Sequence, residues 1–176
     1  MAKVAFVLGA DFEDSEFKVP YDRIREAGHK VTVVGTETKE VKGKKGKEKF
    51  TPEATPKDVS ADQFDAVVIP GGYSPDHLRT DDGIVSLVQK INGADKPVAA
   101  ICHAGSLLIE ADAVNGKRVT SWPSIRTDLI NAGARWEDSE VVEDGNLITS
   151  RKPDDLDAFC AAIVRVLASA SARSAA

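Results

Sequence analysis

The sequence predicts an α/β fold, a three-layer α/β/α sandwich with a mostly parallel sheet. Short continuous apolar runs at Val4–Leu8 and Val98–Ile101 are typical of strands that are buried on both faces, and a further buried strand is predicted at Phe64–Ile69. Segments with helical spacing of apolar residues separate these runs, and such alternation indicates parallel strands joined by crossover helices. The 176 residues are enough for one such domain, which we assign to 1–168.

The first strand ends at Gly9, and apolar residues at helical spacing then predict a helix that stops at Gly28. A second strand is expected at Val31–Val34. The segment after it is rich in lysine and glycine, and we expect a solvated hairpin whose lysines guard a sheet edge. Few aromatic residues lie nearby to stack on bases, so nucleic-acid binding is not expected. The lysines concerned are Lys39, Lys42, Lys44, Lys45, Lys47 and Lys49.

The rest of the chain continues the alternation of helices and strands. A helix is expected before the strand Val98–Ile101, another after it, and a third that ends at Gly133. A hairpin is predicted around Glu143–Asn146, where turn residues separate two apolar pairs. An amphipathic helix at Leu156–Leu167 closes the domain, and residues 169–176 lack apolar periodicity and are expected to form a flexible tail.

Charge and cysteine usage restrict the class of protein. The net charge of −5 gives no broad positive field for nucleic acid or an anionic membrane, and no apolar run approaches the length of a membrane span. The two cysteines, Cys102 and Cys160, lack metal-ligand spacing and lie far apart. We therefore expect a reduced, cytoplasmic protein without a metal or cofactor.

Cys102 is the main candidate for a reactive group. It ends a buried strand and is followed by His103 and by a turn through Gly105 into a helical segment. Such an elbow exposes a nucleophile at the carboxyl edge of a sheet, where backbone N–H groups and the helix dipole favour thiolate. The alternative is a small buried hydrophobic residue, which is also expected of Cys160 on the last helix.

Ligands of parallel sheets bind beyond the carboxyl ends of the strands, and two more segments meet Cys102 there. In one of them, Gly71 and Gly72 can supply a backbone N–H to a developing oxyanion, as can the N–H of His103; a simple turn is the alternative for the glycines. His103 is a candidate general base, and Asp76 can set its tautomer. Ser74-Pro75-Asp76 reads equally as the capped start of a helix.

The other segment carries Glu13, Asp14 and Glu16 after the first strand. Acidic residues at a helix start usually interact with the helix dipole. If Glu16 reaches Cys102, two anions in contact are costly, so the carboxyl should keep its proton and donate it to the sulfur. The expected signature is a thiolate beside a protonated carboxyl at neutral pH.

From about Lys3 to Leu167 the chain resembles the PfpI-type intracellular peptidases and deglycases of the DJ-1/PfpI superfamily, which are related in fold to class I glutamine amidotransferases. The resemblance implies a flavodoxin-like sandwich with a nucleophile elbow. The motifs that carry it are Asp11–Phe17, Ile69–Asp76, Ala99–His103, Asp128–Ala134 and Thr149–Leu156.

The resemblance assigns Cys102 as the nucleophile, Glu16 as the carboxyl at the sulfur, and Gly72 with His103 as oxyanion donors. It implies that a neighbouring subunit donates the acid at Asp76, because members form dimers that assemble further into hexamers. It also places Trp122 near the site as a wall of the pocket, with a core tryptophan as the alternative.

Two departures from the family pattern affect the site. Ala104-Gly105-Ser106 replaces the Gly-Pro that often follows Cys-His, so the helix start and pocket rim are expected to differ. Asp76 is one methylene shorter than the glutamate of relatives, which weakens a peptidase-type triad.

Three functions follow as hypotheses. The first is an enzyme, without a cofactor, in which Cys102 attacks a reactive carbonyl such as methylglyoxal, glyoxal or their early adducts. The second is an ATP-independent peptidase that uses Cys102, His103 and Asp76 on peptide substrates. The third is a non-enzymatic stress sensor or chaperone in which Cys102 is oxidised to sulfinate.

Overall fold

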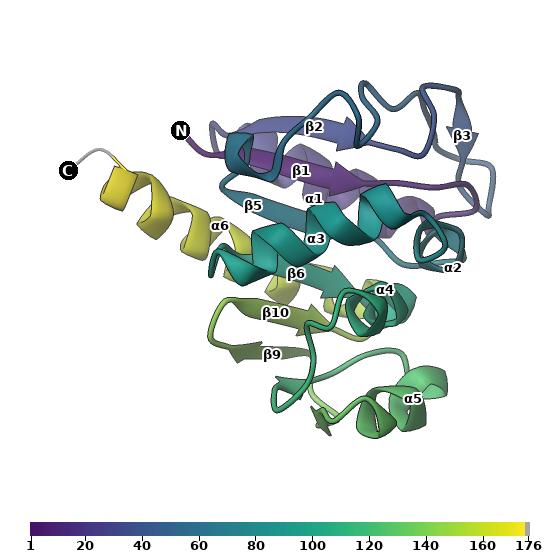
Figure 1. The fold of residues 1–176 in the computed structure, drawn as a ribbon, viewed down its shortest axis with the longest axis vertical. Helices are drawn as coiled ribbons and strands as arrows, with labels where there is room; N and C mark the ends of the chain where they lie inside the picture. The colour runs from purple at the N-terminus through teal and green to yellow at the C-terminus, as the bar shows by residue number, and fades with distance from the viewer. Residues whose placement is uncertain (175–176) are drawn as a thin grey trace.

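The computed structural model describes residues 1–174 and has a six-stranded sheet at its centre, with strand order β2-β1-β5-β6-β10-β9 (Figure 1). All neighbouring pairs are parallel except β9 and β10, which form an antiparallel hairpin. The strands are β1 (Lys3–Val7), β2 (Lys30–Val34), β5 (Ala66–Ile69), β6 (Val98–Ile101), β9 (Val141–Asp144) and β10 (Leu147–Ser150). The predicted mostly parallel sheet is confirmed.

The strand order reverses at β1, which pairs with β2 on one side and with β5 on the other. At such a reversal the connections leave the sheet in opposite directions, and a crevice opens at the carboxyl ends of the strands. Figure 1 shows α2 (Ser74–Leu78) and α4 (Gly105–Glu110) beyond the arrowheads at this edge. The loops that follow β1, β5 and β6 therefore converge on one place.

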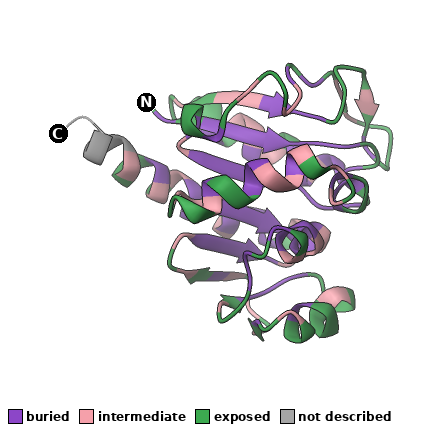
Figure 2. Ribbon diagram, viewed as in Figure 1, coloured by how far each residue is buried: buried purple, intermediate pink, exposed green. Residues whose placement is uncertain are grey.

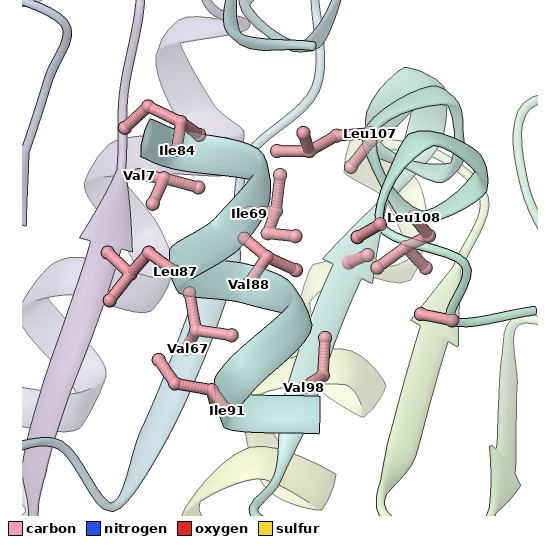
Figure 3. Close-up of a cluster of buried hydrophobic side chains, with 14 of the residues drawn as sticks. Val7, Val67, Ile69, Ile84, Leu87, Val88, Ile91, Val98, Leu107 and Leu108 are labelled. Carbon is pink, nitrogen blue, oxygen red and sulfur yellow. The ribbon is translucent and has the colours of Figure 1, made fainter. Parts of the chain in front are cut away.

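Helices cover both faces of the sheet. The helix α3 (Asp82–Gly93) lies in front of it in Figure 1, and its buried residues Ile84, Leu87, Val88 and Ile91 pack with inward side chains of the strands (Figure 3). Their spacing places them on one stripe of the helix. Each fully buried side chain of this kind contributes about 1.5–3 kcal/mol to folding.

The helices α1 (Asp14–Glu26) and α6 (Leu156–Ser174) cover the opposite face. An aromatic group anchors α1 there: Phe17 makes edge-on contacts with Phe6 and Phe12, with ring centroids 6.0 and 5.2 Å apart. Figure 2 shows that the four inner strands β1, β5, β6 and β10 are buried along most of their length, whereas the edge strands β2 and β9 are partly exposed. Burial on both faces explains their continuous apolar runs.

Most elements lie where the sequence predicted them. The lysine-rich hairpin is β3 (Val41–Lys42) with β4 (Lys49–Phe50), and the short helix before Gly133 is α5 (Arg126–Asn131). A small parallel pair, β7 (Arg118–Val119) with β8 (Arg135–Trp136), was not expected. The last helix continues through Ser174 and so includes most of the predicted tail, of which residues 175–176 lie outside the described part.

Ser74 is not the helix cap that the sequence suggested. It is the first residue of α2, and its hydroxyl accepts a hydrogen bond from the Gly9 N–H at 2.8 Å, which ties this loop to the end of β1. Asp81 caps the separate helix α3 instead, accepting from the Ile84 N–H at 2.9 Å. Across residues 1–174, no helix has the length and apolar character needed to span a membrane.

Candidate active site

Cys102 occupies a sharp turn between β6 and α4. Its φ of 62° lies in the left-handed region, which non-glycine residues adopt at a cost of about 1–3 kcal/mol. A single 3₁₀ turn, Cys102–Ala104, connects the strand to the helix, and the Cys102 carbonyl accepts from the Trp122 N–H at 3.2 Å. The side chain is buried, with 7% of the residue exposed. This is the elbow that the sequence predicted.

Backbone N–H groups of Gly72 and His103 are directed at the Cys102 sulfur. Gly72 has a φ of 75°, and a Cβ there would overlap the backbone of Glu13 and lie 2.6 Å from the Asp11 oxygen. The turn therefore requires glycine. These two N–H groups are the ones that can stabilise an oxyanion formed next to the sulfur.

Gly71 does not join them, contrary to the sequence-based assignment. Its N–H donates to Glu16 Oε2 at 2.9 Å. A Cβ on Gly71 would overlap that oxygen and lie 2.7 Å from the Cys102 Cβ, so the carboxyl and the cysteine side chain meet at this glycine. Gly71 thus positions Glu16 and leaves the oxyanion to Gly72 and His103.

Glu16 is fully buried, and its other oxygen, Oε1, has no hydrogen-bond partner among the described residues. Burial raises the pKa of this carboxyl, the hydrogen bond from the Gly71 N–H lowers it and the charge of Glu13 raises it; the net pKa is about 8. The carboxyl is therefore protonated at neutral pH. It has a proton to donate beside Cys102, as the sequence predicted.

The sulfur itself behaves differently from the prediction of a thiolate. Burial, followed by the charge of Glu16, raises the pKa of the Cys102 thiol to about 12, while the N–H groups of His103 and Gly72 lower it. Burial, the largest cause, opposes a thiolate whatever the state of Glu16, so the predicted thiolate is not supported. When Glu16 holds its proton the repulsion is absent and the O–H can donate to sulfur, so the pair ionises as a unit.

His103 lies beside the nucleophile. Its Nδ1 is 3.3 Å from Cys102 Sγ, because the turn at Cys102 brings adjacent side chains together. Its Nε2 is 3.2 Å from the hydroxyl oxygen of Ser124, a partner that no sequence signal indicated. Burial, and then the charge of Lys44, lower the pKa of the imidazole, so it is neutral at pH 7 and can accept a proton.

Asp76 does not complete a triad within the chain. No hydrogen bond or ion pair joins it to His103 in the described part of the molecule, although both residues line a cavity of about 630 Å³. Trp122 is 40% exposed, which excludes the core alternative, and its ring centroid lies 6.4 Å from that of His103. The indole therefore flanks the imidazole at the edge of the site.

The lysine hairpin, residues 41–50, is not simply solvated. Lys44 and Lys45 form ion pairs with the two oxygens of Glu13 at 2.8 and 2.7 Å, and Glu13 is only 3% exposed. Backbone N–H groups of the hairpin also bind the buried carboxylate of Asp14. Glu13 and Asp14 thus hold the hairpin against the start of α1 and are not mainly partners of the helix dipole.

A model of the DJ-1/PfpI family matches residues 2–166. The chain belongs to this family. Among similar curated proteins, General stress protein 18 of Bacillus subtilis is 48% identical over 89% of this chain and 92% of its own length. Protein/nucleic acid deglycase 2 of Escherichia coli is 44% identical over 94% and 97%. Putative cysteine protease YraA of Bacillus subtilis is 47% identical over 89% and 93%.

Solved structures of the DJ-1/PfpI family have the same fold. The crystal structure of Drosophila melanogaster DJ-1beta superposes with a TM-score of 0.86 at 32% identity, over 93% of this chain and 88% of that one. The resemblance stated from sequence motifs is therefore confirmed for both family and fold. The names of the relatives indicate an enzyme but differ in the reaction.

The raised pKa of Glu16 predicts how stability of this family member depends on pH. The folded state binds this proton up to about pH 8, whereas the unfolded chain releases it near 4.5, so the carboxyl makes the free energy of unfolding fall as pH rises between these values. Glu16→Gln should remove this fall, which is on the order of a few kcal/mol. Urea titrations at pH 5 and 8.5 measure the free energy of unfolding of both proteins. An equal fall between these pH values in the wild type and in Glu16→Gln would contradict the prediction.

Proposed function

We propose that the chain is an enzyme, working without a cofactor, in which Cys102 attacks the carbonyl of a small 2-oxoaldehyde or of its early adducts on protein. The observation that carries the proposal is the group of atoms around one sulfur. Two backbone N–H groups, from Gly72 and His103, and the protonated carboxyl of Glu16 all lie against it. Thiol, oxyanion donors and a proton carrier are what addition to a carbonyl requires.

With methylglyoxal as the substrate, the reaction needs only water as a second reactant. The sulfur adds to the aldehyde carbon and forms a hemithioacetal, whose oxygen accepts from the two N–H groups. The hydrogen on that carbon then moves as a proton to the neighbouring ketone carbon through an enediol, and the proton that the thiol brought moves from the hemithioacetal oxygen to the former ketone oxygen, which yields a thioester of lactate. Water hydrolyses the thioester and regenerates the thiol. Glu16 and neutral His103, both in contact with the sulfur, are the candidates to carry the proton.

The relatives support this reaction class. One close relative is named a deglycase of protein and nucleic acid, and another a general stress protein. Glycated protein is therefore a second substrate form that we propose for the same site. The cavity beside His103, about 630 Å³ and open to solvent, leaves room for a side chain that carries the adduct.

Purified protein supplied with methylglyoxal and no glutathione is expected to form lactate, which lactate dehydrogenase detects. Release of free amine from a methylglyoxal adduct of a peptide would extend the activity to glycated protein. If neither product forms in the reducing buffer that keeps Cys102 a thiol, the proposal is wrong.

Peptide hydrolysis is the second candidate, favoured by the relative named a putative cysteine protease. Amides are poorer electrophiles, and their leaving group needs a proton from an oriented imidazole. Within the described chain His103 bonds to Ser124 and not to Asp76, so this reaction would require the acid from a second copy in a homo-oligomer. Amidase activity that persists in Asp76→Ala, or at dilutions where the protein is monomeric, would exclude this arrangement.

A further inference from the structure

The lysine hairpin brings two cations to the start of α1, and they differ in their relation to the site. Both pair with the buried carboxylate of Glu13, Lys44 with Oε2 and Lys45 with Oε1. The Lys44 side chain is 37% exposed and that of Lys45 is 53% exposed. The Lys44 side chain is thus the more enclosed of the two.

Backbone contacts connect this ion pair to the loop after β5, which carries Gly71 and the oxyanion donor Gly72. Phe12 bridges to Gly43 of the hairpin on one side and to Gly72 on the other. The Lys44 N–H donates to the Phe12 carbonyl at 2.9 Å, and the Glu13 N–H donates to the Gly71 carbonyl at 3.2 Å. The backbones of Lys44 and Glu13 are therefore tied to the loop that carries Gly71 and Gly72.

We infer that Lys44 is a positioning residue that sets the ionisation of the Cys102–Glu16 pair, by holding a positive charge against the buried carboxylate of Glu13, whose N–H binds the Gly71 carbonyl. The charge acts through Glu13 and through space and does not touch the substrate. This inference rests on the proposed function, since it concerns the proposed nucleophile.

The electrostatics agree with this geometry. Burial raises the pKa of Glu16 and the charge of Glu13 raises it further, whereas the charge of Lys44 lowers it. The charged and titratable groups that act on the pair are Glu13, Lys44 and His103. Lys45 and Asp14 belong to the contact between the hairpin and α1, where the Lys45 N–H binds the Asp14 carboxylate. Without Lys44, Glu13 would repel the pair more strongly, and loss of a proton from sulfur would become harder.

The test measures the rate at which iodoacetamide alkylates Cys102 as a function of pH, in a Cys160→Ala background so that one thiol reacts. Lys44→Met is expected to raise the apparent pKa and slow alkylation at pH 7 about three- to tenfold. Lys45→Met is the matched control, because it removes the more exposed cation from the same carboxylate, and should change the rate less than about twofold. Lys44→Arg should restore the wild-type profile.

A double substitution separates charge from structure. Glu13→Gln should lower the apparent pKa of the thiol, and Glu13→Gln with Lys44→Met should return it close to wild type because both charges are gone. Equal shifts for Lys44→Met and Lys45→Met, or no shift for Lys44→Met, would overturn the inference. Alkylation reads the sulfur directly, so this result is independent of whether lactate is the product.

Discussion

Cys102→Ala is expected to abolish lactate formation from methylglyoxal, with a loss of at least about a thousandfold in kcat. The remaining groups can bind a carbonyl and polarise its oxygen, but no atom remains to form the hemithioacetal. The effect exceeds that of removing one oxyanion donor, because the whole covalent route depends on the sulfur. The glutathione-free lactate assay measures the loss.

The matched control is Cys160→Ala. Cys160 is buried on α6, and burial raises the pKa of its thiol to about 11, so it is expected to contribute nothing to turnover. This variant should keep the wild-type kcat. Retained turnover in Cys102→Ala, or a comparable loss in Cys160→Ala, would contradict the assignment of the nucleophile.

The strands of the central sheet could be predicted because burial on both faces imposes continuous apolar runs. The run Val98–Ile101 coincides with β6, and the run at Val4–Leu8 overlaps β1. The pair β7 and β8 could not be predicted, since each strand has two residues and shows no period. The Ser74 hydroxyl was assigned to its own helix because its true partner, Gly9, is distant in the chain.

The residues of the site were predictable where they follow strands. Parallel strands place their carboxyl ends at one edge, which is why Glu16, Gly72 and Cys102 could be grouped before their contacts were known. Contacts that depend on how loops pack were not predictable. Ser124, beside His103, follows no strand of the main sheet. The sequence showed a basic segment and an acidic group at separate places, but nothing in it indicated that Lys44 and Lys45 pair with Glu13.

Ionisation is the property that the sequence predicts least well. Residue types alone indicated a proton shared by Glu16 and Cys102, and the burial of Glu16 supports that part. The equilibrium between thiol and thiolate at Cys102 depends on how deeply the sulfur is buried and on whether the neighbouring carboxyl holds its proton. Both are results of packing, so the pH dependence of the thiol needs the three-dimensional structure.

Gly72→Ala is expected to reduce both stability and activity. The φ of 75° costs an L-residue about 1–2 kcal/mol, and the added methyl would overlap the Glu13 nitrogen and lie 2.7 Å from the Phe12 carbonyl carbon. These are backbone atoms that cannot rotate away. We expect a loss of about 3 kcal/mol or more in the free energy of unfolding. Displacement of the Gly72 N–H should also lower kcat about a hundred- to a thousandfold.

Gly28→Ala isolates the cost of the positive φ from the cost of the overlap. Gly28 has a φ of 86°, but nothing lies within 4 Å of a Cβ placed there, and it follows the far end of α1. This variant should lose about 1–2 kcal/mol and keep its kcat. Urea denaturation and the lactate assay on both variants give the comparison. If Gly72→Ala lost no more stability than Gly28→Ala and kept its kcat, the loop after β5 would have room for a side chain, and its N–H could not be the oxyanion donor that the site requires.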